Sequence, residues 1–182
     1  MKGLTLFPHQ KQFIESQAKV TVMHGGCGTG KTFALNYAIC EYMKRDHAVA
    51  HGAAFVINPE NYIKSLMQMA EWRGEQVSKS GRIVLYDYKS LIVEDQGWLN
   101  DRKNVQTMGR LIPIWLDISD IASKRTISIL SKINERYKDC LHIRIVCAPL
   151  PEDVTGRMDH IDFIKVPAIS NPHAVEEAFP HD

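Results

Sequence analysis

Apolar residues along this chain gather in short runs that alternate with segments of helical spacing. Five runs rich in Val, Ile, Leu and Phe are typical of buried strands, and they cover residues 20–23, 53–57, 82–86, 112–117 and 141–146. Apolar side chains recur at helical spacing in residues 33–39, 62–70 and 127–137. This alternation predicts an α/β fold in which helices cover a mainly parallel sheet of five or more strands.

Two local features refine this pattern. Pro113 fits the fourth strand only at its start, because proline has no N–H for the ladder. Residues 94–110 are polar and without clear periodicity, which predicts a loop or a short helix. No repeat or linker interrupts the 182 residues. We therefore expect one domain, with residues 1–18 as an upstream segment and helix and residues 19–182 as the core.

Composition narrows the class of protein without naming a function. The chain is 45% hydrophobic and 24% charged, as globular proteins are, and its formal net charge of +1 predicts no bulk attraction to nucleic acid or membrane. The four cysteines show no metal-ligand spacing, and no signal-peptide pattern or long apolar run is present. We expect a soluble intracellular protein, cytoplasmic or nuclear, with no membrane partner.

One motif carries specific chemistry, because a full G-x-x-x-x-G-K-[ST] match lies between the first strand and the following helix. Its glycines let backbone N–H groups turn toward phosphate oxygens, and the helix N-terminus adds positive potential. Lys31 is expected to reach the β- and γ-phosphates of ATP, and the Thr32 hydroxyl to ligate Mg²⁺. The predicted nucleotide-binding residues are Gly25, Gly26, Cys27, Gly28, Thr29, Gly30, Lys31 and Thr32.

Further segments stand in a suggestive order around this loop. They are Leu6-Phe7-Pro8-His9-Gln10 upstream, then Val56-Ile57-Asn58-Pro59 with Trp72, Tyr86-Asp87-Tyr88-Lys89-Ser90-Leu91, Asp117-Ile118-Ser119-Asp120 and Val146-Cys147-Ala148-Pro149. In order and spacing, these segments resemble the first RecA-like lobe of superfamily 2 helicases and translocases, especially the Snf2-like branch. The resemblance covers nearly the whole chain; the phosphate loop is its specific part, and the other segments contribute mainly through their order.

The resemblance implies an ATP-binding lobe of a nucleic-acid motor. It places Gln10 as the residue that reads adenine, and Asp117 with Thr32 at the Mg²⁺ ion. It also implies a partner: a second RecA-like lobe of about a hundred or more residues, which carries the arginine fingers and half of the nucleic-acid track. A lone lobe is expected to bind DNA or RNA only weakly.

This sequence departs from the family pattern at the catalytic acid. Ile118 stands where the family has the glutamate that orients the attacking water, so we expect slow or partner-dependent hydrolysis. Ile118→Glu is expected to raise turnover if the loop geometry is otherwise like that of the family. Asp120 is a substitute candidate for the base or an ordinary loop acid or helix N-cap. Lys31, Asp117 and Asp120 are thus the candidate catalytic residues.

Two other functions stay open at this point. A P-loop small-molecule kinase would share the size and the phosphate cradle, although no arginine-rich lid is evident. A catalytically inactive nucleotide-binding interaction protein would explain Ile118. Three outcomes distinguish these functions. Turnover stimulated by nucleic acid indicates the helicase-related lobe, phosphate transfer to a metabolite indicates the kinase, and nucleotide binding without turnover indicates the inactive interaction protein.

Overall fold

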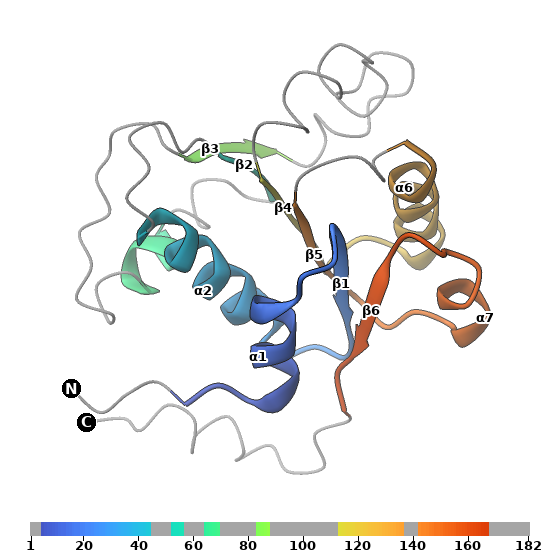
Figure 1. Cartoon of the computed structure of the whole chain (residues 1–182), viewed down its shortest axis with the longest axis horizontal. Helices are drawn as coiled ribbons and strands as arrows, with labels where there is room; N and C mark the ends of the chain where they lie inside the picture. The colour runs from blue at the N-terminus through green and yellow to red at the C-terminus, as the bar shows by residue number, and fades with distance from the viewer. Residues whose placement is uncertain are drawn as a thin grey trace.

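The fold is known from a computed structural model that describes residues 5–44, 52–56, 64–69, 83–87, 113–136 and 142–167. The sheet lies at the centre with helices on both faces (Figure 1). Its strands are β1 Val20–His24, β2 Gly52–Val56, β3 Ile83–Asp87, β4 Ile114–Ile118, β5 Ile143–Cys147 and β6 Asp162–Lys165. The helices are α1 Pro8–Glu15, α2 Lys31–Lys44, α6 Ser123–Arg136 and the single turn α7 Glu152–Thr155, with residues 64–69 also helical.

All described strand pairs are parallel, and the order across the sheet is β3-β2-β4-β5-β1-β6. Strand β5 therefore lies between β1, which leads into the phosphate loop, and β4, which carries Asp117. Because the strands are parallel, their carboxyl ends meet at one edge of the sheet. The phosphate loop and Asp117 are brought together at this edge although 85 residues separate Thr32 from Asp117 along the chain.

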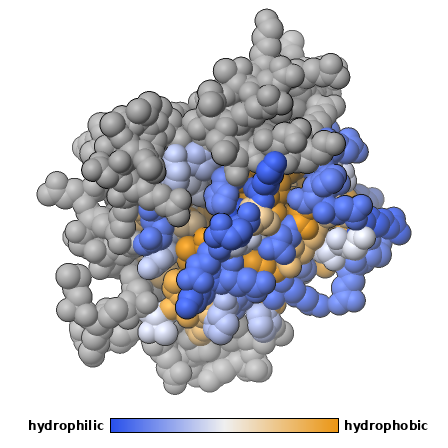
Figure 2. Space-filling view, viewed as in Figure 1, coloured by the Kyte–Doolittle hydropathy of each residue, from blue (hydrophilic) through white to orange (hydrophobic). Residues whose placement is uncertain are grey.

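Two apolar clusters hold the helices onto the sheet. On one face, Leu116 and Ile145 pack with Ile129, Leu130 and other residues of α6. On the other face, the cluster combines residues of α1 and α2 with strand residues; it includes Phe13, Leu35, Ile39, Met23, Trp115 and Val146. Figure 1 shows the same division, with α1 and α2 on one side of the sheet and α6 and α7 on the other. On the face drawn in Figure 2, hydrophilic residues surround a central group of apolar residues.

The structure confirms the predicted α/β class, in which helices flank a parallel sheet. All five predicted strands are present within two residues of their expected ends, and Pro113 precedes β4 as its missing N–H requires. Strand β6 and the turn α7 were not predicted, because a four-residue edge strand has little apolar content to mark it. Residues 94–110, Asn58-Pro59 and Trp72 lie outside the described residues.

Candidate functional site

The phosphate loop turns sharply between β1 and α2. Gly28 and Gly30 have φ angles of 71° and 74°, the left-handed region that glycine enters without steric cost. The Gly25 amide donates to the Cys147 carbonyl at 3.3 Å, which ties the start of the loop to β5. A Cβ atom on Gly25 would lie only 2.7 Å from the Cβ of Val166. Backbone conformation therefore favours glycine at positions 28 and 30, and the close approach of the Val166 side chain favours it at position 25.

Lys31 is the buried cation of the loop, with 6% of its surface exposed. Its ammonium donates to the carbonyls of Gly25 at 3.0 Å and Gly26 at 2.5 Å, and it lies 3.4 Å from the Thr29 hydroxyl oxygen. Burial lowers the pKa of Lys31, and the negative charges of nearby acidic groups, Asp117 among them, oppose that shift. The ammonium is therefore directed into the loop, where a phosphate group of a nucleotide would contact it.

Thr32 and Asp117 form the second half of the site. The Thr32 hydroxyl donates to Asp117 Oδ2 at 2.8 Å, and the Ser119 amide donates to Asp117 Oδ1 at 3.2 Å. Burial raises the pKa of Asp117, while the hydrogen bonds from Thr32 and Ser119 lower it. A hydroxyl and a carboxylate oxygen side by side are hard ligands of the kind that Mg²⁺ prefers, so these two residues could hold that ion.

The structure places Ile118 on the opposite face of the sheet from Asp117. Ile118 is fully buried in the cluster that packs against α6, as alternation along a strand requires. A glutamate here would lie in the apolar core and not beside the phosphates. The structure does not test turnover, but the burial of Ile118 leads us to expect the opposite of the sequence-based prediction, namely that Ile118→Glu does not raise turnover.

Asp120 lies on the exposed turn after β4. Its charge raises the pKa of Asp117 and that of Lys31, so it contributes to the electrostatics of the site. No described hydrogen bond connects Asp120 to the phosphate loop.

Gln10 lies directly against the loop and is 3% exposed. Its Oε1 accepts from the Phe7 amide at 3.0 Å, and its Nε2 donates to the Gly30 carbonyl at 3.2 Å. An amide side chain offers two donors and two acceptor lone pairs, so one of each remains for a base. Gln10 thus has a structural role in bracing the loop that its sequence position alone did not indicate.

Two histidines that the sequence analysis did not single out border the loop. The His9 ring stacks on Phe7 at 5.7 Å, and its Nε2 is buried without a hydrogen-bond partner. Burial lowers the pKa of His9, and the Thr29 backbone opposes this shift. His24, the last residue of β1, is buried on the α6 face of the sheet. The sequence assigned neither of them a role, although His9 lies in the segment that ends at Gln10 and His24 directly precedes the phosphate loop, so their position in space marks them.

The cysteines of the described region give no sign of nucleophilic chemistry. Cys27 is exposed in the loop, whereas Cys40 and Cys147 are buried. Burial raises the pKa of Cys147 to about 12, so this thiol stays protonated and unreactive near neutral pH. Nor do the described His, Cys, Asp and Glu residues form any group of three or more that could hold a metal ion.

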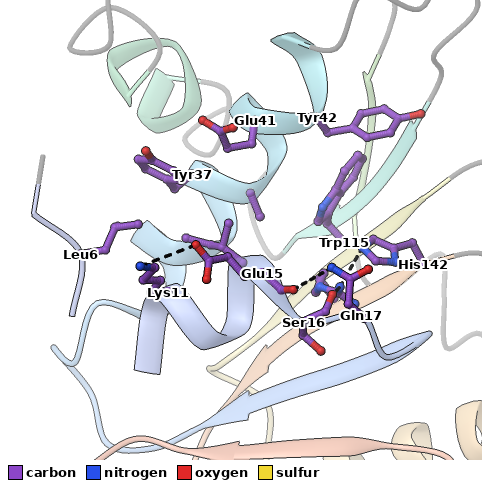
Figure 3. A pocket seen from close by; sticks show the side chains of 13 residues that line it. Leu6, Lys11, Glu15, Ser16, Gln17, Tyr37, Glu41, Tyr42, Trp115 and His142 are labelled. Carbon is purple, nitrogen blue, oxygen red and sulfur yellow. Dashed lines mark hydrogen bonds and ion pairs between the residues drawn. The ribbon is translucent and has the colours of Figure 1, made fainter. Parts of the chain in front are cut away.

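A separate cavity of about 430 Å³ opens between α1, α2 and the amino ends of β4 and β5 (Figure 3). Trp115 and Tyr42 meet edge to face in its wall, with ring centroids 5.2 Å apart. Its lining carries charges of both signs, among them Lys11 and Glu41. The cavity is at the opposite edge of the sheet from Lys31 and Thr32, so it is distinct from the phosphate loop.

Comparisons with known proteins do not identify this chain. No family model matches it, and no curated protein matches it. Among solved structures, it is similar to the Pif1 helicase from Candida albicans, with 13% identity and a TM-score of 0.43. That match covers 90% of this chain but only 40% of the helicase. A likeness this distant carries no information about activity, and the Snf2-like resemblance stays a prediction.

No helix in the described part of the chain combines the length and the apolar character needed to cross a membrane.

Proposed function

We propose that this chain is a nucleotide-binding RecA-like lobe that binds Mg-ATP at the phosphate loop. The observation that carries the proposal is the 2.8 Å hydrogen bond between Thr32 and Asp117. It joins α2, the helix after the phosphate loop, to β4, which is separated in the sheet from β1 by β5. Lys31 would neutralise phosphate charge, and Thr32 with Asp117 would hold the ion that accompanies it. Gln10 would read adenine with its remaining donor and acceptor.

Hydrolysis by the isolated chain is proposed to be slow. Ile118 lies in the core, so the position beside Asp117 lacks the acid that would orient water. Asp120 is the acid we propose as a substitute base, although catalytic geometry tolerates displacements of only about 1 Å. We further propose that a second RecA-like lobe or another protein completes the site, because an arginine finger from a partner is worth about 10³ to 10⁵ in rate.

Titration with Mg-ATP tests nucleotide binding. The wild-type chain is expected to saturate below millimolar concentration, and Lys31→Ala to weaken binding at least about tenfold with or without Mg²⁺. Asp117→Asn should remove only the part of the affinity that depends on Mg²⁺. Lys19→Ala, an exposed lysine at the amino end of β1, is the control and should bind as the wild type does. Absence of saturable binding by the wild type would refute the proposal.

The class of protein is tested by turnover with and without nucleic acid. A helicase-related lobe should hydrolyse ATP well below about one per second alone, and faster with DNA or RNA or with its partner. Its own affinity for DNA or RNA should be weak and steeply dependent on salt. Tight ATP binding with no turnover under any of these conditions would instead support the inactive interaction protein, which the burial of Ile118 favours.

The proposed role of Gln10 is tested by base preference in the binding titrations. If GTP binds as tightly as ATP, Gln10 does not read adenine.

A further inference from the structure

His24 lies where the strand leading into the phosphate loop ends. It directly precedes Gly25, is 5% exposed, and its carbonyl accepts from the Val166 amide at 2.9 Å. The ring meets Phe163 edge-on, with centroids 6.2 Å apart. The imidazole is therefore held at β1 and β6, on the face of the sheet that packs against α6.

The ring makes one hydrogen bond that spans 126 residues of sequence. The Leu150 amide donates to His24 Nδ1 at 3.2 Å, so Nδ1 carries no proton. Leu150 lies in the β5–α7 loop, residues 148–151, and is flanked by Pro149 and Pro151. Proline has no N–H, so Leu150 supplies the only backbone donor among residues 149–151, and His24 receives it. The side chain of Leu150 is anchored in the same apolar cluster as α6.

The β5–α7 loop leaves the sheet at the centre of the proposed phosphate site. Cys147, the last residue of β5, is in register with His24 on one side and with Ile118 on the other. Its carbonyl also accepts the Gly25 amide. The loop that follows therefore begins between the strand before Lys31 and the strand that carries Asp117.

Charges around the ring favour its neutral form. Lys31 in the phosphate loop and Lys165 on β6 add to the effect of burial, and together they lower the pKa of His24. Lys165 is in turn paired with Glu152 of α7 at 3.0 Å. A neutral ring keeps Nδ1 available as an acceptor, so the contact with Leu150 is maintained at neutral pH.

We infer that His24 is a positioning residue that holds the β5–α7 loop against the phosphate-loop strand, and that this contact supports the preference for ATP over ADP. The inference rests on the proposed function. The terminal phosphate of ATP is the group that Lys31 and Asp117 would bracket, and the end of β5 lies between them. ADP lacks that phosphate, so displacement of the loop should weaken ATP binding more than ADP binding.

Two variants at His24 test the inference. Leu has similar bulk but no acceptor, whereas the Oδ1 of Asn can stand in for Nδ1. In the nucleotide-free protein, His24→Leu should speed hydrogen exchange at the Leu150 amide about tenfold, and His24→Asn should restore protection. The ratio of ADP to ATP dissociation constants should fall severalfold in His24→Leu and recover in His24→Asn. A merely structural loss would weaken both nucleotides equally.

The outcomes separate this inference from the proposed function. Unchanged exchange at Leu150 in His24→Leu would overturn the positioning role, and faster exchange with an unchanged nucleotide ratio would overturn the role in discrimination. If the wild type binds no nucleotide, the proposed function fails and the discrimination role with it, while exchange still reports on the contact. If His24→Leu does not fold, ring ¹⁵N shifts of the wild type decide: the proton should be on Nε2, and a proton on Nδ1 would overturn the inference.

Discussion

At the scale of single residues, neighbours in one strand have opposite environments. Asp117 faces Thr32 on the α2 side of the sheet, whereas Ile118 is fully buried on the α6 side. A strand turns successive side chains to opposite faces, and in this structure Asp117 faces Thr32 whereas Ile118 packs in the cluster that includes α6. The residue after Asp117 is thus a core residue in this chain.

Ile118→Glu should therefore destabilise the protein and leave turnover no faster. Burial of an unpaired carboxylate in this cluster should lower the free energy of unfolding by about 3 kcal/mol or more. Ile118→Leu keeps the volume and should cost less than about 1.5 kcal/mol. Urea unfolding measures both variants. A stable Ile118→Glu protein with faster ATP hydrolysis would mean that the end of β4 turns toward the phosphates.

At the scale of elements, a buried arginine joins the α1–β1 connection to the sheet. Arg144 on β5 is 1% exposed and donates to the carbonyls of Ser16 at 2.5 Å and Ala18 at 3.1 Å. Burial lowers its pKa to about 10, and the charge of Asp162 opposes that shift. The Ser16 hydroxyl accepts from Thr21 at 2.9 Å, so the connection is held from several sides. This network positions α1, and α1 in turn braces the phosphate loop.

Arg144→Met should loosen this connection. The substitution removes the cost of burying a charge but leaves the Ser16 and Ala18 carbonyls without their donor, and we expect a net loss of about 2 kcal/mol. Arg125→Met, at an exposed position on α6, is the matched control and should change stability by less than about 0.5 kcal/mol. Urea unfolding gives the comparison. Equal stability of Arg144→Met and the wild type would show that water from the neighbouring cavity satisfies the carbonyls.

At the scale of the whole molecule, two histidines, the buried His24 and the half-buried His9, couple stability to pH. The pKa values of His9 and His24 are both lowered from the ordinary value of 6.5, mainly by burial. The unfolded chain therefore binds more protons than the folded chain once the pH falls toward 6.5 and below. Both histidines border the phosphate loop, so the acid-sensitive part of the fold coincides with the candidate site.

Thermal unfolding should accordingly show a falling melting temperature from pH 7.5 to 5.5. The loss begins as the pH approaches 6.5, and it is complete for each histidine once its lowered pKa is passed. His24→Asn and His9→Asn should each flatten the profile, because each removes one group that takes up a proton on unfolding. A melting temperature that is constant across this range would contradict the lowered pKa values of both rings. Asp117 acts in the opposite sense, because its raised pKa means that protonation below that pKa favours the folded state.

The sequence by itself determined the parts of this protein that depend on local patterns. Apolar runs located five strands, helical spacing located α2 and α6, and the glycine spacing located the phosphate loop, because each signal lies within a few neighbouring residues. The α/β class followed from their alternation.

Tertiary structure alone decided which distant groups meet. The strand order brings Thr32 to Asp117 and the Leu150 amide to His24, across 85 and 126 residues of sequence. It also adds β6 at the edge of the sheet and makes Gln10 a brace of Gly30. These contacts depend on how the sheet is assembled and on which face each side chain occupies, and neither is encoded in the residues adjacent along the chain.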